Sequence, residues 1–75
     1  MANYIVKETR KDGAVTYYLA GHSTLREGAA RISKYYTYTN IRGANMLKTR
    51  LEKEANDSSK KYEVVECADV GIIVN

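Results

Sequence analysis

Two short alternating segments on either side of Asp12-Gly13 constrain the fold of this chain most. Residues 3–9 and residues 15–20 both alternate apolar and polar side chains with the period of two that is typical of a β-strand. Gly13 tolerates the positive φ that a tight turn between such strands requires. The sequence therefore predicts an antiparallel β-hairpin over residues 3–20.

The length of the chain, 75 residues, allows one domain with one compact interior, which we place over residues 1–75. Cys67 is the only cysteine, so an intrachain disulfide is excluded. Together with His22 it offers two soft ligands, fewer than the three or four that a zinc site needs. We therefore expect no metal and no other cofactor, and stability that depends on packing or self-association.

Two helices are predicted in the middle of the chain. Thr24 and Glu27 have the spacing of a capping box, and apolar residues follow at helical spacing, which predicts a helix over 25–36. Thr39 or Asn40 can cap a second helix over 41–56. The apolar stripe of this second helix consists of Ile41, Ala44, Leu47, Leu51 and Ala55.

Gly43 lies in the first turn of the predicted helix 41–56. Glycine costs about 1 kcal/mol relative to alanine in a helix interior. Its presence near the start of the helix therefore indicates close packing of this turn against another element.

A third strand is predicted over residues 61–67, after a polar loop at residues 56–59. The apolar run 70–74 is compatible with a fourth strand or with a β-tail. The predicted fold is α+β, in the order β-β-α-α-β-(β). The N-terminal hairpin and one or two C-terminal strands form a small antiparallel sheet, and both helices pack on one of its faces.

Net charge is distributed unevenly along the chain. The total is +3, but residues 21–56 carry +4 and residues 57–75 carry −2. A basic middle can attract phosphate or an acidic protein surface, or it can be an ordinary solvated helical surface.

The N-terminal segment lacks the basic and apolar parts of a signal peptide. No segment approaches the roughly 18 consecutive apolar residues of a membrane span. We therefore expect a cytoplasmic protein that has no membrane partner.

The sequence contains no converging set of catalytic residues. Cys67 lies inside a predicted strand and His22 in a distant turn, and a small cysteine on an apolar strand face is usually part of the core. Glu52 and Glu54 project from different sides of their helix and cannot act as a pair. We therefore expect a protein that is not an enzyme.

One surface of the predicted helix 41–56 differs from an ordinary solvated face. On the side opposite the apolar stripe, a methionine is surrounded by cations and a threonine. Cations alone usually serve solubility, whereas an exposed methionine adds adaptable apolar area. Two tyrosines from the junction between the helices can extend this surface. The predicted partner-binding residues are Arg42, Met46, Thr49, Arg50, Lys53, Tyr35 and Tyr38.

Four segments together resemble the layout of small uncharacterised proteins from phages and integrated prophages. They are Tyr17-Tyr18-Leu19, the predicted helix through Ala29-Ala30, the second helix through Ala44, and the run from Tyr62 to Glu66. The resemblance covers most of the chain. It implies an accessory protein that acts on host machinery, and inhibitors of host defence such as anti-CRISPR proteins are one such class. No functional residue carries over, because those proteins have no established catalytic motif.

Our leading hypothesis is a small non-enzymatic binding protein, encoded by a phage or mobile element. It binds a host protein or nucleoprotein complex in the host cytoplasm, and inhibition of a nucleic-acid-handling defence complex such as CRISPR–Cas is one form of this activity. The first alternative is a nucleic-acid-binding module built on the basic helices with interleaved tyrosines. The second alternative is a self-associating structural protein, such as a homodimer, that uses the apolar tail.

Overall fold

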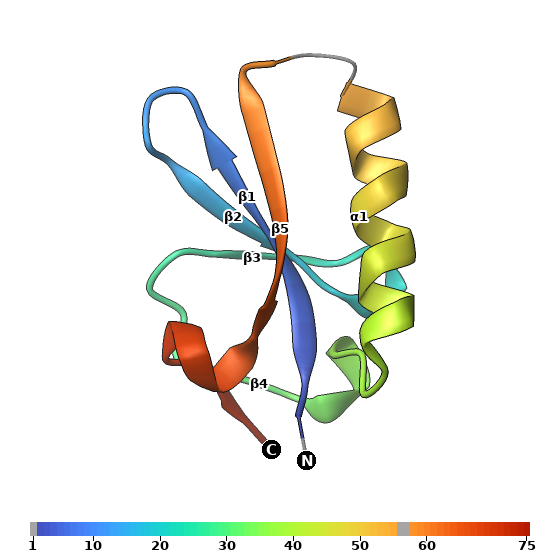
Figure 1. The fold of residues 1–75 in the computed structure, drawn as a ribbon. Coiled ribbons are helices and arrows are strands. Elements are labelled where there is room, and N and C mark those ends of the chain that lie inside the picture. The colour runs from blue at the N-terminus through green and yellow to red at the C-terminus, as the bar shows by residue number, and fades with distance from the viewer. Residues whose placement is uncertain (1, 56–57) are drawn as a thin grey trace.

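The computed structural model describes residues 2–55 and 58–75. In this part of the chain, a four-stranded antiparallel sheet lies between one α-helix and a layer of short C-terminal and connecting segments (Figure 1). The sheet has the strand order β3-β2-β1-β5, so β1 is a central strand and β5 lies at one edge.

The predicted hairpin is confirmed by strands β1 (Tyr4–Arg10) and β2 (Val15–Tyr18), which pair in antiparallel fashion. Gly13 adopts the left-handed φ of +90° in the connecting turn. Asp12 stabilises the same turn, because its Oδ1 accepts a hydrogen bond from the backbone N–H of Ala14 at 2.9 Å.

The predicted third strand is also confirmed, as β5 (Lys60–Glu66). It pairs with β1 along its whole length in antiparallel register, with Tyr4 opposite Glu66 and Arg10 opposite Lys60. The sheet therefore joins the two ends of the chain.

The predicted helix over residues 25–36 is wrong. This segment contains strand β3 (Thr24–Arg26), strand β4 (Arg31–Ile32) and a short 3-10 helix, η2 (Lys34–Tyr36). Gly28 between the two strands has a φ of +94°, which is incompatible with a continuous right-handed helix. The fold is α+β as predicted, but the described chain has one α-helix rather than two, and the element order differs from β-β-α-α-β-(β).

The helical spacing in this segment gave a wrong prediction, because its apolar residues do not form one buried stripe. Leu25 and Ile32 contribute to the core, whereas Tyr36 is 45% exposed. Thr24 to Arg26 instead pair with β2, where backbone hydrogen bonding and cross-strand contacts favour β-structure. The segment contains strong helix formers such as Ala29 and Ala30, but intrinsic propensity does not outweigh these tertiary interactions.

The second predicted helix is confirmed as α1 (Ile41–Ala55), and its predicted end at residue 56 lies outside the described residues. Asn40 caps the helix, because its Oδ1 accepts a hydrogen bond from the backbone N–H of Arg42 at 2.9 Å. Most of the predicted stripe is buried, but Ile41 is 49% exposed. At about 100° per residue, Ile41 lies roughly 80° from the centre of the stripe, which explains this difference.

Close packing at Gly43 is confirmed. A Cβ atom at this position would lie 2.7 Å from Cδ1 of Tyr38, closer than real side-chain contacts allow. Tyr38 is itself fixed by two backbone hydrogen bonds with Tyr4, of 2.7 and 2.9 Å. Because Gly43 has no side chain, the first turn of α1 packs directly against the Tyr38 ring, and Tyr38 is hydrogen-bonded to β1.

Apolar side chains are buried on both faces of the sheet. The cluster under α1 contains Val6, Leu47, Leu51 and Tyr62. The cluster on the opposite face contains Ile5, Tyr17, Leu19, Ile32, Cys67 and Ile72. The alternation that predicted the strands therefore sends each strand's side chains into two separate clusters.

The opposite face is covered by the 3-10 helix η3 (Cys67–Val70) and by a second, two-stranded sheet. Another 3-10 helix, η1 (Ala20–His22), follows β2 along the chain. In that sheet β6 (Ile73–Val74) pairs with β4 in parallel. The apolar tail therefore has a function inside the fold, since Ile72 is buried and β6 is paired.

Candidate functional site

The residues predicted on the solvent side of α1 lie together in the structure. With two neighbours they line a shallow, open depression along the helix, which we call the outer face of α1. Its residues are Ile41, Arg42, Asn45, Met46, Thr49, Arg50 and Lys53. Met46 has 68% of its surface exposed near the middle of this face.

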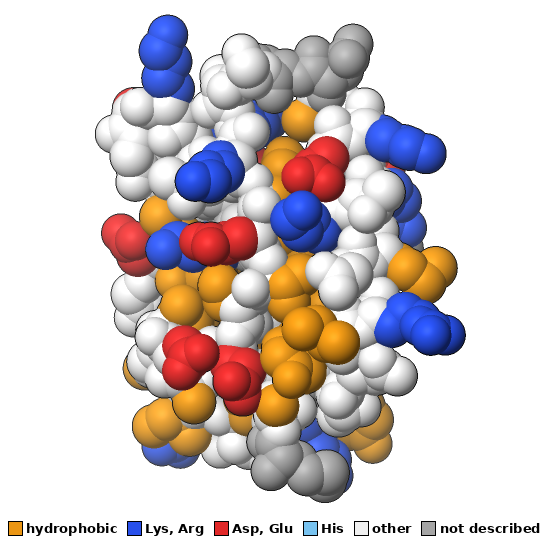
Figure 2. Space-filling model, in the orientation of Figure 1, with side chains coloured by type: hydrophobic (Ala, Val, Ile, Leu, Met, Phe, Trp, Pro, Cys, Tyr) orange, Lys and Arg blue, Asp and Glu red, His pale blue; other side chains and the backbone are white. Residues whose placement is uncertain are grey.

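Positive charge on the outer face is not neutralised locally. The described ion pair on α1 joins Lys48 Nζ to Glu52 Oε2 at 3.2 Å, and Lys48 does not belong to the outer face. Arg42, Arg50 and Lys53 form no ion pair with any described carboxylate. Figure 2 shows Lys and Arg side chains projecting over α1, along the right margin of the molecule, with hydrophobic surface between them.

The two predicted tyrosines have different positions. Tyr38 lines a second hollow beside the outer face, together with Gly43, Met46, Leu47 and Arg50. Tyr35 lies on η2 with 85% of its surface exposed and lines neither of these hollows. The structure therefore joins Tyr38 to the predicted surface, and Tyr35 is a separate exposed ring.

The candidate nucleophile Cys67 is buried, as the strand pattern indicates. Burial raises the pKa of the Cys67 thiol, so the reactive thiolate is disfavoured. The side chain of His22 lies outside what the structure describes. Among the described residues, no group of three or more His, Cys, Asp or Glu side chains is placed to hold a metal ion.

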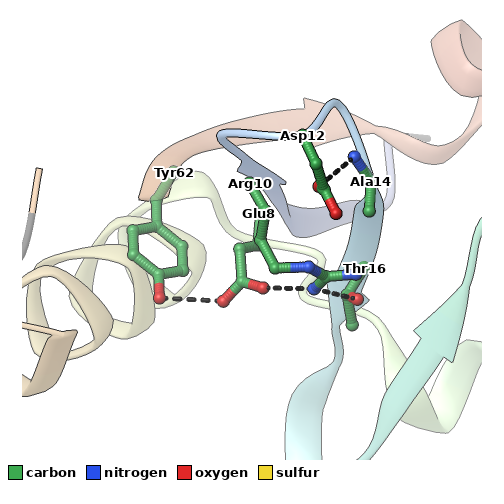
Figure 3. Close-up of polar contacts among 6 residues, drawn as sticks. All are labelled: Glu8, Arg10, Asp12, Ala14, Thr16 and Tyr62. Atoms are coloured by element: carbon green, nitrogen blue, oxygen red, sulfur yellow. Dashed lines mark hydrogen bonds and ion pairs between the residues drawn. The ribbon is translucent and has the colours of Figure 1, made fainter. Parts of the chain in front are cut away.

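The sequence analysis did not predict a buried polar network around the carboxylate of Glu8. Glu8 is only 2% exposed, on the sheet face that α1 covers. Its Oε1 accepts a hydrogen bond from Arg10 Nη1 at 2.7 Å, and its Oε2 accepts one from the Tyr62 hydroxyl at 2.9 Å. Figure 3 shows the Glu8 carboxylate between these two donors, with Arg10 also reaching Thr16 Oγ1.

Strand register explains this arrangement. Glu8 lies directly opposite Thr16 on β2 and opposite Tyr62 on β5, so three neighbouring strands supply one polar row. The sequence signal was present, because Glu8 continues the face of Val6 in the alternating pattern of residues 3–9. A charged residue at a predicted core position indicates a buried polar network.

Hydrogen bonding determines the charge state of Glu8. Burial alone would raise the pKa of its carboxyl, but hydrogen bonds from Tyr62, Arg10 and Tyr18 more than offset this and hold the pKa below its ordinary value. Burial, and then the Glu8 carboxylate, raise the pKa of Tyr18. Glu8 is therefore an ionised, fully bonded group that stabilises the sheet, rather than a poised acid or base.

No protein-family model, curated protein or solved structure matches this chain. Within the described residues, no helix combines the length and the hydropathy that crossing a lipid bilayer requires.

Proposed function

We propose that this chain is a non-enzymatic binding protein and that the outer face of α1, with Tyr38 beside it, is its contact surface. The observation that carries the proposal is Met46, which is 68% exposed between unpaired cations. The opposite side of α1 already supplies the buried contacts that the fold needs, through Leu47 and Leu51. Packing of the core therefore gives no reason for an exposed methionine at this position.

The chemistry of this surface fits an acidic protein. Arg42, Arg50 and Lys53 attract negative charge and speed association. Met46 supplies flexible apolar area that anchors a protein contact once polar neighbours exclude water. An interface of this kind combines an apolar centre with a charged rim.

The resemblance to phage and prophage accessory proteins suggests where such a partner is found. In our proposal it is a host protein or nucleoprotein complex in the host cytoplasm. Inhibition of a nucleic-acid-handling defence complex is the form of activity that this class of protein suggests.

Direct binding of nucleic acid is a second candidate, supported by the spacing of the cations. Arg42 and Arg50 are separated by about 12 Å along the helix axis, and Lys53 extends the row by one more turn. Such a row can follow a phosphate backbone. The exposed Met46 favours the protein partner instead, because an apolar side chain neutralises no phosphate.

Capture from a bacterial lysate tests these two candidates. The parent chain, Met46→Ala and Lys48→Ala are immobilised, and each is exposed to lysate with and without nuclease. Lys48 is the matched control, since it lies on the same helix but is paired with Glu52. We expect a protein that survives nuclease treatment, is lost with Met46→Ala and is kept with Lys48→Ala. Retention that disappears with nuclease supports the second candidate, and equal retention of a nuclease-resistant protein by all three contradicts the first.

A further inference from the structure

The two edges of the main sheet differ in length and regularity. The edge strand β3 has three residues, whereas the edge strand β5 has seven. Pairing of β5 with β1 is one-to-one throughout, without a bulge, and the chain contains no proline. Natural proteins protect an edge by shortness, bulges, proline or charged side chains, and of these β5 has only the charged side chains.

Backbone groups of β5 are directed toward the open edge. The N–H of Cys67 donates to the carbonyl of Asn3 at 2.9 Å, which marks a hydrogen-bonded pair next to the β1–β5 ladder. Hydrogen-bonded and non-bonded pairs alternate along an antiparallel ladder. The N–H and C=O groups of Lys60, Val64 and Glu66 therefore point away from β1.

Charge along β5 is segregated. Lys60 and Lys61 are in its first half, and Glu63 and Glu66 are in its second half. Figure 2 shows side chains of both signs on the face where β5 lies in front of the sheet. Antiparallel pairing with an identical strand places opposite charges together, whereas parallel in-register pairing would oppose like charges.

We propose that β5 is a homodimer interface, in which β5 of a second copy pairs with it in antiparallel fashion about a two-fold axis. Lys61 lies opposite Glu63 of the second copy, and the reverse pair forms by symmetry. Lys60 and Val64 of the two copies exchange backbone hydrogen bonds. A shift to the neighbouring register would put Glu63 against its own copy, which is unfavourable. The two four-stranded sheets become one continuous sheet.

The dimer places both copies of α1 on the same side of the continuous sheet. The outer faces remain accessible, because Met46 and Lys53 project away from the sheet rather than across the axis. Two contact surfaces on one side can engage a two-fold symmetric or repeated target with higher avidity. The interface itself does not depend on the proposed function.

Sedimentation equilibrium of the full chain over a range of concentrations tests the interface. We expect a mass of about twice 8.5 kDa for the parent. Lys61→Glu and Glu63→Lys, each alone, oppose like charges and should weaken dimerisation about tenfold or more. The double variant Lys61→Glu/Glu63→Lys restores both opposite pairs and should dimerise like the parent. Both residues are exposed, and circular dichroism checks that each variant keeps the fold, because Glu63 also lies opposite Lys7 on β1.

Proline substitution tests the direction of the backbone groups. Val64→Pro removes an outward N–H, so it should keep the fold and yield a monomer. Val65→Pro removes an N–H that bonds to β1 and should disrupt the fold, which makes it the matched control. A parent that is monomeric at every concentration overturns the proposal. A dimer that all single variants leave unchanged overturns it as well.

Discussion

The hydroxyl of Tyr62 donates a hydrogen bond of 2.9 Å to the carboxylate of Glu8, and this contact joins residues 54 positions apart. Both side chains are buried under α1, where an unpaired carboxylate would be costly. The side chains therefore add a hydrogen bond between β1 and β5 to the backbone hydrogen bonds that pair these strands. Burial of the charged Glu8 in the N-terminal hairpin therefore requires the C-terminal strand β5.

Removal of this hydroxyl should destabilise the protein. Tyr62→Phe keeps the ring but leaves Glu8 without one of its donors, so we expect a loss of about 1–3 kcal/mol in the free energy of unfolding. Urea titration measures the loss. Tyr35→Phe is the matched control, because that ring is largely exposed, and it should change stability by less than about 0.5 kcal/mol. Equal stability of both variants would show that the Glu8 contact contributes nothing.

Stability should decrease in acid because of Glu8. Its folded-state pKa is lower than the ordinary value of 4.5, so the folded state binds this proton less readily than the unfolded state. The contribution is complete well above 4.5, declines as the pH falls through that value, and is lost below the folded pKa. The urea concentration at the midpoint of unfolding, measured from neutral pH down to a pH of about 3, reports this loss of stability.

The Glu8→Gln variant isolates this effect from other carboxylates. It lacks the titrating group, so the stability difference between parent and variant should shrink as the pH falls. A difference that stays constant over the same range would show that the pKa of Glu8 is the same in both states.

Alanine at Gly43 should destabilise the protein, although alanine normally favours helices. The added Cβ would approach the Tyr38 ring to 2.7 Å, and relief of this overlap should cost about 1–3 kcal/mol. A double-mutant cycle with Tyr38→Ala checks the cause by thermal or urea unfolding. With the ring absent, Gly43→Ala should become neutral or stabilising by up to about 1 kcal/mol. A stabilising effect in the parent background would contradict the packing.

The two sides of α1 should separate folding from binding. Leu51→Ala removes a buried side chain in the cluster under the helix and should cost about 2–5 kcal/mol. Met46→Ala, on the exposed side, should stay within about 0.5 kcal/mol of the parent. Thermal unfolding of both variants measures the difference, and a reversed order would mean that the faces of α1 are wrongly assigned.

Local periodicity was sufficient to predict the hairpin, α1 and β5, because each buries a regularly spaced set of side chains. It failed over residues 25–36, where the decisive interactions are not local. β3 depends on pairing with β2, and β4 depends on pairing with β6, more than 40 residues later. A helical spacing of apolar residues carries no information about such distant partners.

The candidate site, like the fold, was predicted only in part. The residues on α1 share one helix, so the angle between residues was enough to bring them together. Tyr35 lies in the misassigned segment 25–36 and Tyr38 in the junction after it, so neither could be placed from spacing alone. Glu8 lies on the same face of its strand as Val6, but the residues opposite it, Thr16 and Tyr62, depend on strand pairing that local spacing does not reveal.

Binding affinity across a range of salt tests the central claim, that the outer face of α1 binds an acidic protein partner. The parent, Arg50→Ala, Met46→Ala and Lys48→Ala are compared by calorimetry with the captured partner. We predict that Arg50→Ala and Met46→Ala each weaken binding by about five- to thirty-fold, and that Lys48→Ala binds like the parent. Salt should reduce the effect of Arg50→Ala but leave the effect of Met46→Ala largely unchanged. Equal affinity of all four proteins would place the contact surface elsewhere and contradict the claim.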